Sequence, residues 1–195
     1  MSDKTAFGVL SVGIMVAAYV IYLWQTMKKR GVQPHPFSWL LWGLVTAVVY
    51  LVQRDRNGGA GSWVTGITAI VCFVIGTVTL VKNRWHFSWF DWLSLGTGLT
   101  VFAFYLIARD PTQSAVLATI TDVLGYAATV KKGWAEPHKD SATSFALNSV
   151  KFIPALFALH SYSLATWLYP ATLVFVNGGV AVMLLLRRRS LEWGR

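Results

Sequence analysis

Two ionisable side chains, Asp122 and Lys151, stand inside long apolar stretches of the chain. Asp122 lies near the middle of the stretch at 113–130, and Lys151 near the middle of the stretch at 142–160. A charge at the centre of a membrane-spanning helix costs about 2.5–3.5 kcal/mol on insertion scales, which makes such residues functional candidates. If the two stretches are sequential antiparallel helices, both charges lie at the same depth. We therefore expect the two side chains to approach within ion-pair distance.

Two interpretations of this pair stay open. In the first, the pair is structural, because an opposite charge lets each buried charge be compensated. In the second, the pair lines a path through the membrane and binds an ionic substrate or a proton. Burial makes the protonation of Asp and Lys sensitive to their surroundings, which suits such a role. Nearby, Asn148 lies one turn before Lys151 on the same helix face, and Thr119 and Ser144 extend the polar stripe.

The composition indicates that these stretches cross a membrane. The chain has 195 residues, of which 55% are hydrophobic and 13% are charged, and its mean hydropathy is +0.52. Soluble globular domains carry about 25% charged residues. In lipid, backbone amides are satisfied only within a helix or a closed barrel, and the ten-residue alternation of a barrel strand is absent. The expected fold is all-α, a polytopic membrane protein.

Seven stretches are long enough to span a bilayer. They lie at about 6–27, 36–52, 62–82, 88–108, 113–130, 142–160 and 162–186. With seven spans, the N-terminal tail and three loops share one side and carry four Lys and Arg residues, whereas the other side carries twelve. The positive-inside rule then predicts an inner (cell) membrane protein with its N-terminus outside and its C-terminus in the cytoplasm.

The same asymmetry explains the net charge of +9. The basic residues flank the spans, where they set the topology and contact anionic lipid. The expected partners are therefore the lipid bilayer and a small solute, with no nucleic acid. A homo-oligomer is compatible with the sequence.

An internal repeat organises the chain. Residues 26–29 (TMKK) match residues 129–132 (TVKK) at an offset of 103, and the Pro-His pair in 33–35 recurs in 136–138 at the same offset. The ends of the third and seventh spans match at an offset of 105. These matches predict two parallel three-helix units joined by one extra helix, a plan that some transporters use with a site between the repeats.

The predicted boundaries are 1–82 for the first unit, 83–112 for the linker helix, and 113–195 for the second unit with its basic tail. This register places Tyr19 opposite Asp122 and Trp42 opposite Asn148. The expected pocket has an aromatic wall from the first unit and a polar wall from the second, a general form of small-molecule site. Packing between helices is the alternative role for Trp42.

A 3+1+3 order with the N-terminus outside, and with lysines closing the first helix of each unit, resembles the SWEET and PQ-loop superfamily. The resemblance implies asparagines facing the pore in the third helix of each unit, which Asn177 matches, with Cys72 at the corresponding position of the first unit. At the family's Pro-Gln positions this chain has 21–22 (IY) and 124–125 (LG). The chain is also similar to an uncharacterised group of bacterial seven-helix proteins, which implies no activity.

We therefore predict a transporter or facilitator of a small polar solute that works by alternating access. A seven-helix receptor or photosensor is the second class, although a retinal protein normally has its Schiff-base lysine in the last helix, and this helix has none. A membrane enzyme is not expected, because HExxH, GxSxG and a carboxylate cluster are missing. No cofactor or metal is predicted. A structural or assembly protein without a substrate stays an alternative.

Overall fold

The computed structural model describes residues 3–27, 35–82 and 87–193 of the chain. Residues 28–34, which hold most of the first copy of the two repeated motifs, lie outside this range. The described elements are α1 (Asp3–Met27), α2 (Pro36–Asp55), η1 (Gly59–Ser62), α3 (Trp63–Lys82), α4 (Trp89–Ala108), α5 (Pro111–Ala135), η2 (Pro137–Lys139), α6 (Ala142–Val150), α7 (Phe152–Phe157) and α8 (Leu164–Trp193). The fold is all-α within the described residues.

Capping residues set where several of these helices begin. Ser88 and Asp91 form a reciprocal capping box at the start of α4. The Asp110 side chain accepts hydrogen bonds from the first backbone amides of α5, and Pro111 occupies the first helical turn, where its missing N–H is not needed. Ser141 caps α6 in the same way. The helix starts therefore follow from local sequence, and they lie within a few residues of the predicted ones.

Five described helices are long and apolar enough to cross a membrane: α1, α2, α3, α4 and α8. The other two predicted spans do not meet this description. At 25 residues α5 is long enough, but it carries Asp122 and two lysines near its C-terminal end. The predicted span at 142–160 is divided at Lys151 into α6 and α7, which have nine and six residues.

The bundle is apolar on its outside. Many large hydrophobic side chains of α1 and α4 are exposed, including Val20 and Trp24 on α1 and Trp92 and Ile107 on α4. In water, exposed apolar surface of this extent is unfavourable for a monomer. The long apolar helices and this exterior are compatible with insertion into a membrane.

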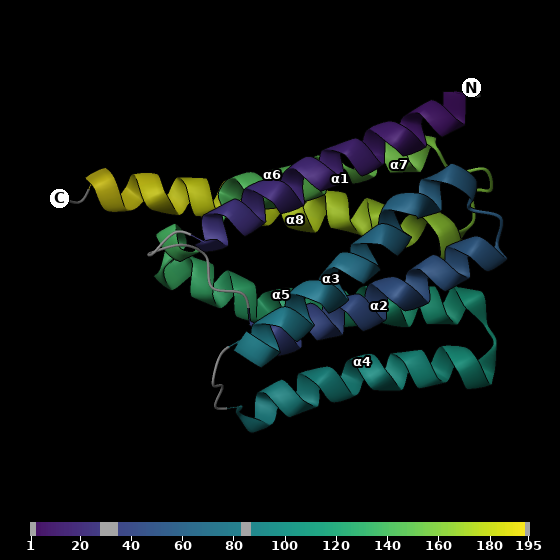
Figure 1. Cartoon of the computed structure of the whole chain (residues 1–195), viewed down its shortest axis with the longest axis horizontal. Helices are drawn as coiled ribbons and strands as arrows, with labels where there is room; N and C mark the ends of the chain where they lie inside the picture. The colour runs from purple at the N-terminus through teal and green to yellow at the C-terminus, as the bar shows by residue number, and fades with distance from the viewer. Residues whose placement is uncertain (1–2, 28–34, 83–86, 194–195) are drawn as a thin grey trace.

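The helices pack in a matching order in the two halves of the chain. In the first half α3 contacts both α1 and α2, and in the second half α8 contacts both α5 and α6. Across the halves, α1 packs against α6 and α7, and α2 packs against α5. Figure 1 shows α4 at one edge, where it packs on α2 and α5, and it shows the two termini at opposite ends of the bundle.

Candidate functional site

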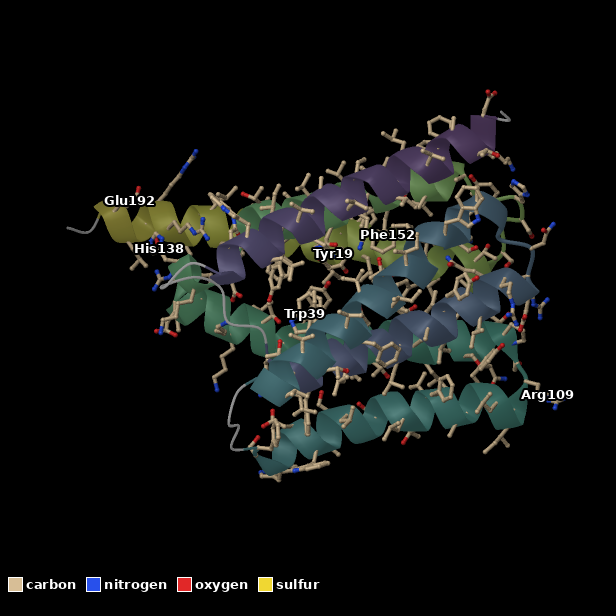
Figure 2. All side chains as sticks on the ribbon, in the orientation of Figure 1. Tyr19, Trp39, Arg109, His138, Phe152 and Glu192 are labelled. Carbon is tan, nitrogen blue, oxygen red and sulfur yellow. The ribbon has the colours of Figure 1, made fainter. Side chains whose placement is uncertain are left out.

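A cavity of about 140 Å³ lies between the two halves of the bundle. Its walls come from α1, α2, α3, α5, α6, α7 and α8, together with residues that flank α2 and α6. Seven residues that the sequence singled out line it: Tyr19, Trp42, Cys72, Asp122, Asn148, Lys151 and Asn177. Tyr19, Trp39 and Phe152 all lie in the middle of the bundle (Figure 2).

Lys151 occupies the break between α6 and α7. Pro154 has no N–H to donate to the carbonyl of Val150, four residues earlier, so the helical ladder is interrupted there. Ser11 of α1 donates a hydrogen bond to the Lys151 carbonyl oxygen at 2.6 Å. The break was not predicted, although Pro154 is a sequence signal that could have indicated it. The break therefore lies directly beside Lys151. The carbonyl oxygen of Lys151 accepts the hydrogen bond from α1 at this point.

The Lys151 ammonium is enclosed by groups from three helices. Its side chain is among the largest that are fully buried, and Nζ donates a hydrogen bond to Thr68 Oγ1 on α3 at 3.0 Å. Nζ also lies 5.1 Å from the ring centroid of Tyr19 and 4.9 Å from that of Phe152. Both distances fall within the range of cation–π attraction. Hydroxyl and aromatic groups therefore stabilise this charge.

Asp122 is the second buried charge of the cavity. The residue is 2% exposed, and its Oδ2 has no hydrogen-bond partner among the described residues. The predicted ion pair with Lys151 is wrong, because the described residues contain no salt bridge between these two side chains. The two charges lie in different walls of one cavity, and they remain close enough to interact electrostatically.

Aromatic rings form a chain across both halves of the bundle. Trp39 packs on Trp42 with ring centroids 5.5 Å apart, Trp42 on Tyr126 at 5.7 Å, and Tyr126 on Phe145 at 6.4 Å. The prediction of one aromatic wall and one polar wall is therefore wrong, since both halves supply rings. Tyr126 was missed, although it follows Asp122 by one helical turn and so shares its face.

Three of the predicted residues, Asn177, Tyr19 and Cys72, take part in hydrogen bonds within the cavity walls. Tyr126 donates from its hydroxyl to Asn177 Oδ1 at 3.0 Å, and Asn177 Nδ2 donates to the Leu173 carbonyl at 3.0 Å. The hydroxyl of Tyr19 lies 3.9 Å from Cys72 Sγ. By contrast, Trp42 Nε1 is buried and has no partner among the described residues. Among the described residues that line the cavity, Asp122 and Asp140 thus each have an unpaired acceptor oxygen, and Trp42 has an unpaired donor.

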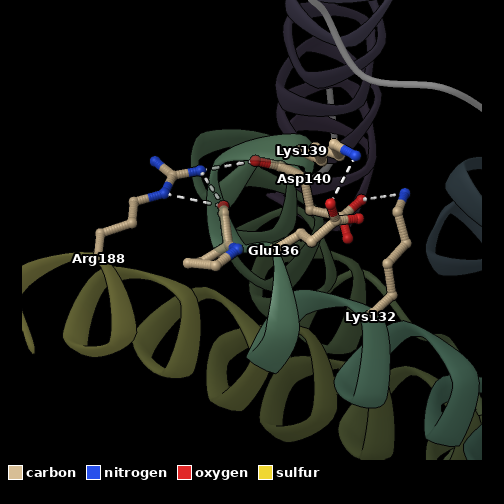
Figure 3. A network of polar contacts seen from close by, with 6 residues as sticks. Lys132, Glu136, Lys139, Asp140 and Arg188 are labelled. Atoms are coloured by element: carbon tan, nitrogen blue, oxygen red, sulfur yellow. Dashed lines mark hydrogen bonds and ion pairs between the residues drawn. The ribbon is translucent and has the colours of Figure 1, made fainter. Parts of the chain in front are cut away.

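At one end the cavity reaches polar residues near the surface. His35 and Lys132 line this end, and their side chains are 36% and 40% exposed. Lys132 Nζ lies 3.5 Å from Asp140 Oδ1. Arg188 of α8 donates to the carbonyl oxygens of Pro137 and Asp140 and so holds the α5–α6 connection in place (Figure 3). We call this end the mouth.

Two titratable side chains at the mouth, Asp140 and His35, have shifted pKa values. Burial raises the pKa of Asp140, and the charges of Lys132 and Arg188 oppose the shift. Burial lowers the pKa of His35, although Asp91, with Oδ1 3.6 Å from His35 Nε2, acts in the opposite direction. Burial therefore outweighs the nearby carboxylate, and the neutral imidazole is favoured at this position.

The opposite end of the bundle is tightly closed by small residues. A Cβ on Gly8 of α1 would lie 2.8 Å from the Cβ of Ala60 in η1. A Cβ on Gly61 would lie 2.6 Å from the Ala155 carbonyl oxygen and 2.8 Å from the Leu159 amide nitrogen. Only glycine allows backbones to approach this closely. The Gly8 contact holds α1 against η1, and the Gly61 contacts join η1 to α7 and to the residues that follow it.

Hydrogen bonds between the two halves of the chain reinforce this closure. Lys4 Nζ donates to the Leu159 carbonyl at 2.7 Å. Gln53 Nε2 near the end of α2 donates to the Thr166 carbonyl of α8 at 2.9 Å, and Gln53 is fully buried. We call this set of contacts between the two halves the seal. It lies at the end of the bundle that holds the N-terminus, away from the mouth.

Comparisons of the chain with protein-family models, with curated proteins and with solved structures give no match. Among the described residues, no group of three His, Cys, Asp or Glu side chains is placed to hold a metal ion. We therefore infer the function from the cavity and its polar groups.

Proposed function

We propose that this protein is a membrane transporter or facilitator that moves a small polar solute by alternating access through the central cavity. The observation that carries the proposal is the cavity itself: it contains the fully buried Asp122 and Lys151, and it reaches polar residues at the mouth. Buried ionisable groups inside a membrane are expensive, and they commonly mark substrate or ion pathways. The cavity combines aromatic rings with polar and charged side chains. Small-molecule sites likewise use aromatic surface for contact and polar groups to orient the ligand.

The packing order supports a 3+1+3 arrangement of two parallel units. In each unit the third helix lies between the first and the second, and the first helix of each unit packs against the second helix of the other. A rotation about an axis along the bundle would exchange these contacts. The linker helix α4 takes no part in lining the cavity. Two such units around a central site can rock against each other.

The mouth and the seal suggest which state the structure represents. The mouth lies at the end of the bundle that carries most of the Lys and Arg residues, which the positive-inside rule assigns to the cytoplasm. The seal lies at the other end and joins the two units through the close backbone contact at Gly61 and through the hydrogen bonds of Lys4 and Gln53. In this proposal the structure is inward-facing, and breaking the seal while closing the mouth gives the outward-facing state.

Uptake by liposomes tests the proposal. The full chain is reconstituted, and uptake of radiolabelled sugars, nucleosides, vitamins and amino acids is measured against protein-free liposomes. Asn148→Trp places a large ring in the cavity, whereas Ala146→Trp places the same ring on the exposed face of the same helix. We expect uptake by the wild type and by Ala146→Trp, and loss of uptake in Asn148→Trp. Equal uptake by both variants would contradict a route through this cavity.

A further inference from the structure

The cavity buries one acid and one base that do not neutralise each other by direct contact. Asp122 is 2% exposed and Lys151 is 1% exposed, yet no salt bridge joins them. The mouth provides a contrast, because there Lys132 and Asp140 lie 3.5 Å apart. Isolated buried charges are costly unless they are paired and hydrogen-bonded. The arrangement is therefore suited to a ligand that supplies the missing partners.

Each charge retains capacity for a ligand. The Asp122 carboxylate has an oxygen, Oδ2, without a hydrogen-bond partner among the described residues. The Lys151 ammonium has three N–H groups, and the hydrogen bond that the structure assigns to it goes to Thr68 Oγ1. The rings of Tyr19 and Phe152 attract the charge but do not replace an anionic acceptor. The acid therefore lacks a donor, and the base lacks an anion.

The two charges have opposite signs and suit opposite ends of one molecule, and aromatic rings lie near both of them. Tyr126 follows Asp122 by one turn of α5, and its ring packs on Trp42 at 5.7 Å. Aromatic faces beside a carboxylate favour a cationic group. On the other side of the cavity, the Lys151 ammonium and the Thr68 hydroxyl can both bind an anionic group.

We infer that the substrate is a small zwitterion, with a cationic group bound at Asp122 and an anionic group bound at Lys151 and Thr68. This inference rests on the proposed transport function and names its substrate class. A neutral sugar would leave both protein charges uncompensated, and a singly charged solute would compensate only one of them. A cavity of about 140 Å³ suits a compact molecule of the size of an amino acid or a betaine.

Binding to the purified full chain in detergent tests the substrate class. The twenty common amino acids and glycine betaine are screened by isothermal titration calorimetry, and the tightest-binding amino acid is compared with three derivatives of its own skeleton. The N-acetyl derivative keeps only the anion, the methyl ester keeps only the cation, and the doubly blocked form keeps neither. We expect the zwitterion to bind at least about tenfold more tightly than each derivative. Equal or tighter binding of any derivative, or no binding by any zwitterion, overturns the inference.

Variants assign each end of the ligand to a protein group. Asp122→Asn should abolish the advantage of the zwitterion over the N-acetyl anion, and Lys151→Met should abolish its advantage over the methyl ester. A purely structural role predicts that either change weakens all four compounds equally. Glu192→Gln and Lys131→Met, at exposed positions outside the cavity, are the matched controls and should leave the ratios unchanged.

A milder variant covers the case in which these changes prevent folding. Thr68→Val keeps both charges and removes only the hydroxyl beside Lys151. We expect it to weaken the zwitterion and the N-acetyl anion by the same factor while the methyl ester is unaffected. Weakening of the methyl ester alone would overturn the assignment of the anionic end.

Uptake separates failure of this inference from failure of the proposed function. If liposomes with the protein take up a sugar or a nucleoside but no zwitterion, the transport function stands and the zwitterion assignment falls. If the charge-dependent binding pattern is observed but no solute crosses the membrane, the binding site stands and the transport function falls.

Discussion

The ammonium of Lys151 donates its hydrogen bond to the hydroxyl of Thr68, 3.0 Å away, and not to the carboxylate of Asp122. The partner lies on α3, 83 residues earlier in the chain, whereas Asp122 lies on α5. The two buried charges consequently line one cavity without forming a salt bridge with each other. Several consequences for stability, pH dependence and topology can be measured directly.

Removing the Thr68 hydroxyl should destabilise the fold. Thr68→Val leaves the buried ammonium without its hydrogen bond, and hydrogen bonds to charged groups contribute about 1.5–3 kcal/mol. Thr65→Val is the matched control, because Thr65 lies one turn earlier on α3, is fully buried, and has an unpaired Oγ1. Chemical denaturation in detergent should show a lower free energy of unfolding for Thr68→Val and little change or a gain for Thr65→Val. Equal losses would contradict the role of Thr68.

Adding a methyl group at the seal should weaken it. In Gly61→Ala the new Cβ would lie 2.6 Å from a backbone oxygen of Ala155, which cannot move without shifting α7. We expect a loss of about 1–3 kcal/mol, the usual range for overpacking. Gly13→Ala on α1 meets nothing within 4 Å and should gain up to about 1 kcal/mol from helix propensity. The thermal midpoints of the two variants should therefore move in opposite directions, and a neutral Gly61→Ala would show that the seal is loose.

Acidification should remove the contribution of His35 to stability. Because burial lowers the pKa of His35 below its ordinary value of about 6.5, the folded state favours the neutral imidazole. That contribution is fully present above about pH 6.5 and is lost as the pH falls through the lower folded-state pKa. The thermal midpoint of the wild type relative to His35→Gln should therefore decrease between pH 8 and pH 5. An increase over this range would mean that Asp91 outweighs burial.

Cysteine labelling tests the orientation that the proposal requires. Cys72 is buried and is first replaced by alanine. A single cysteine is then placed at the exposed Gln113, at the end of the bundle that holds the N-terminus, or at the exposed Ser190, near the C-terminal end. An impermeant maleimide should label the first from outside intact cells and should reach the second only after the membrane is opened. The reverse pattern would place the mouth outside the cytoplasm.

Local sequence determined much of the fold. Hydropathy, capping residues and proline positions depend on neighbours along the chain, so the helix boundaries of α1 to α4 were predicted to within a few residues. The mid-span charges, the repeat register and the resemblance to the SWEET and PQ-loop superfamily together identified seven residues that line the cavity. These predictions succeeded because a residue's depth in a helical bundle follows from its position along its own helix.

The tertiary structure decided what those residues contact. The sequence indicated that Asp122 and Lys151 lie at a similar depth, but it did not indicate that the two side chains form no salt bridge or that Lys151 pairs with Thr68 of α3. The break at Lys151 combines the local effect of Pro154 with a hydrogen bond from Ser11 on α1. The closure at Gly61 likewise depends on backbone atoms about a hundred residues later in the chain. Contacts of this kind are set by packing between helices, which one-dimensional periodicity does not encode.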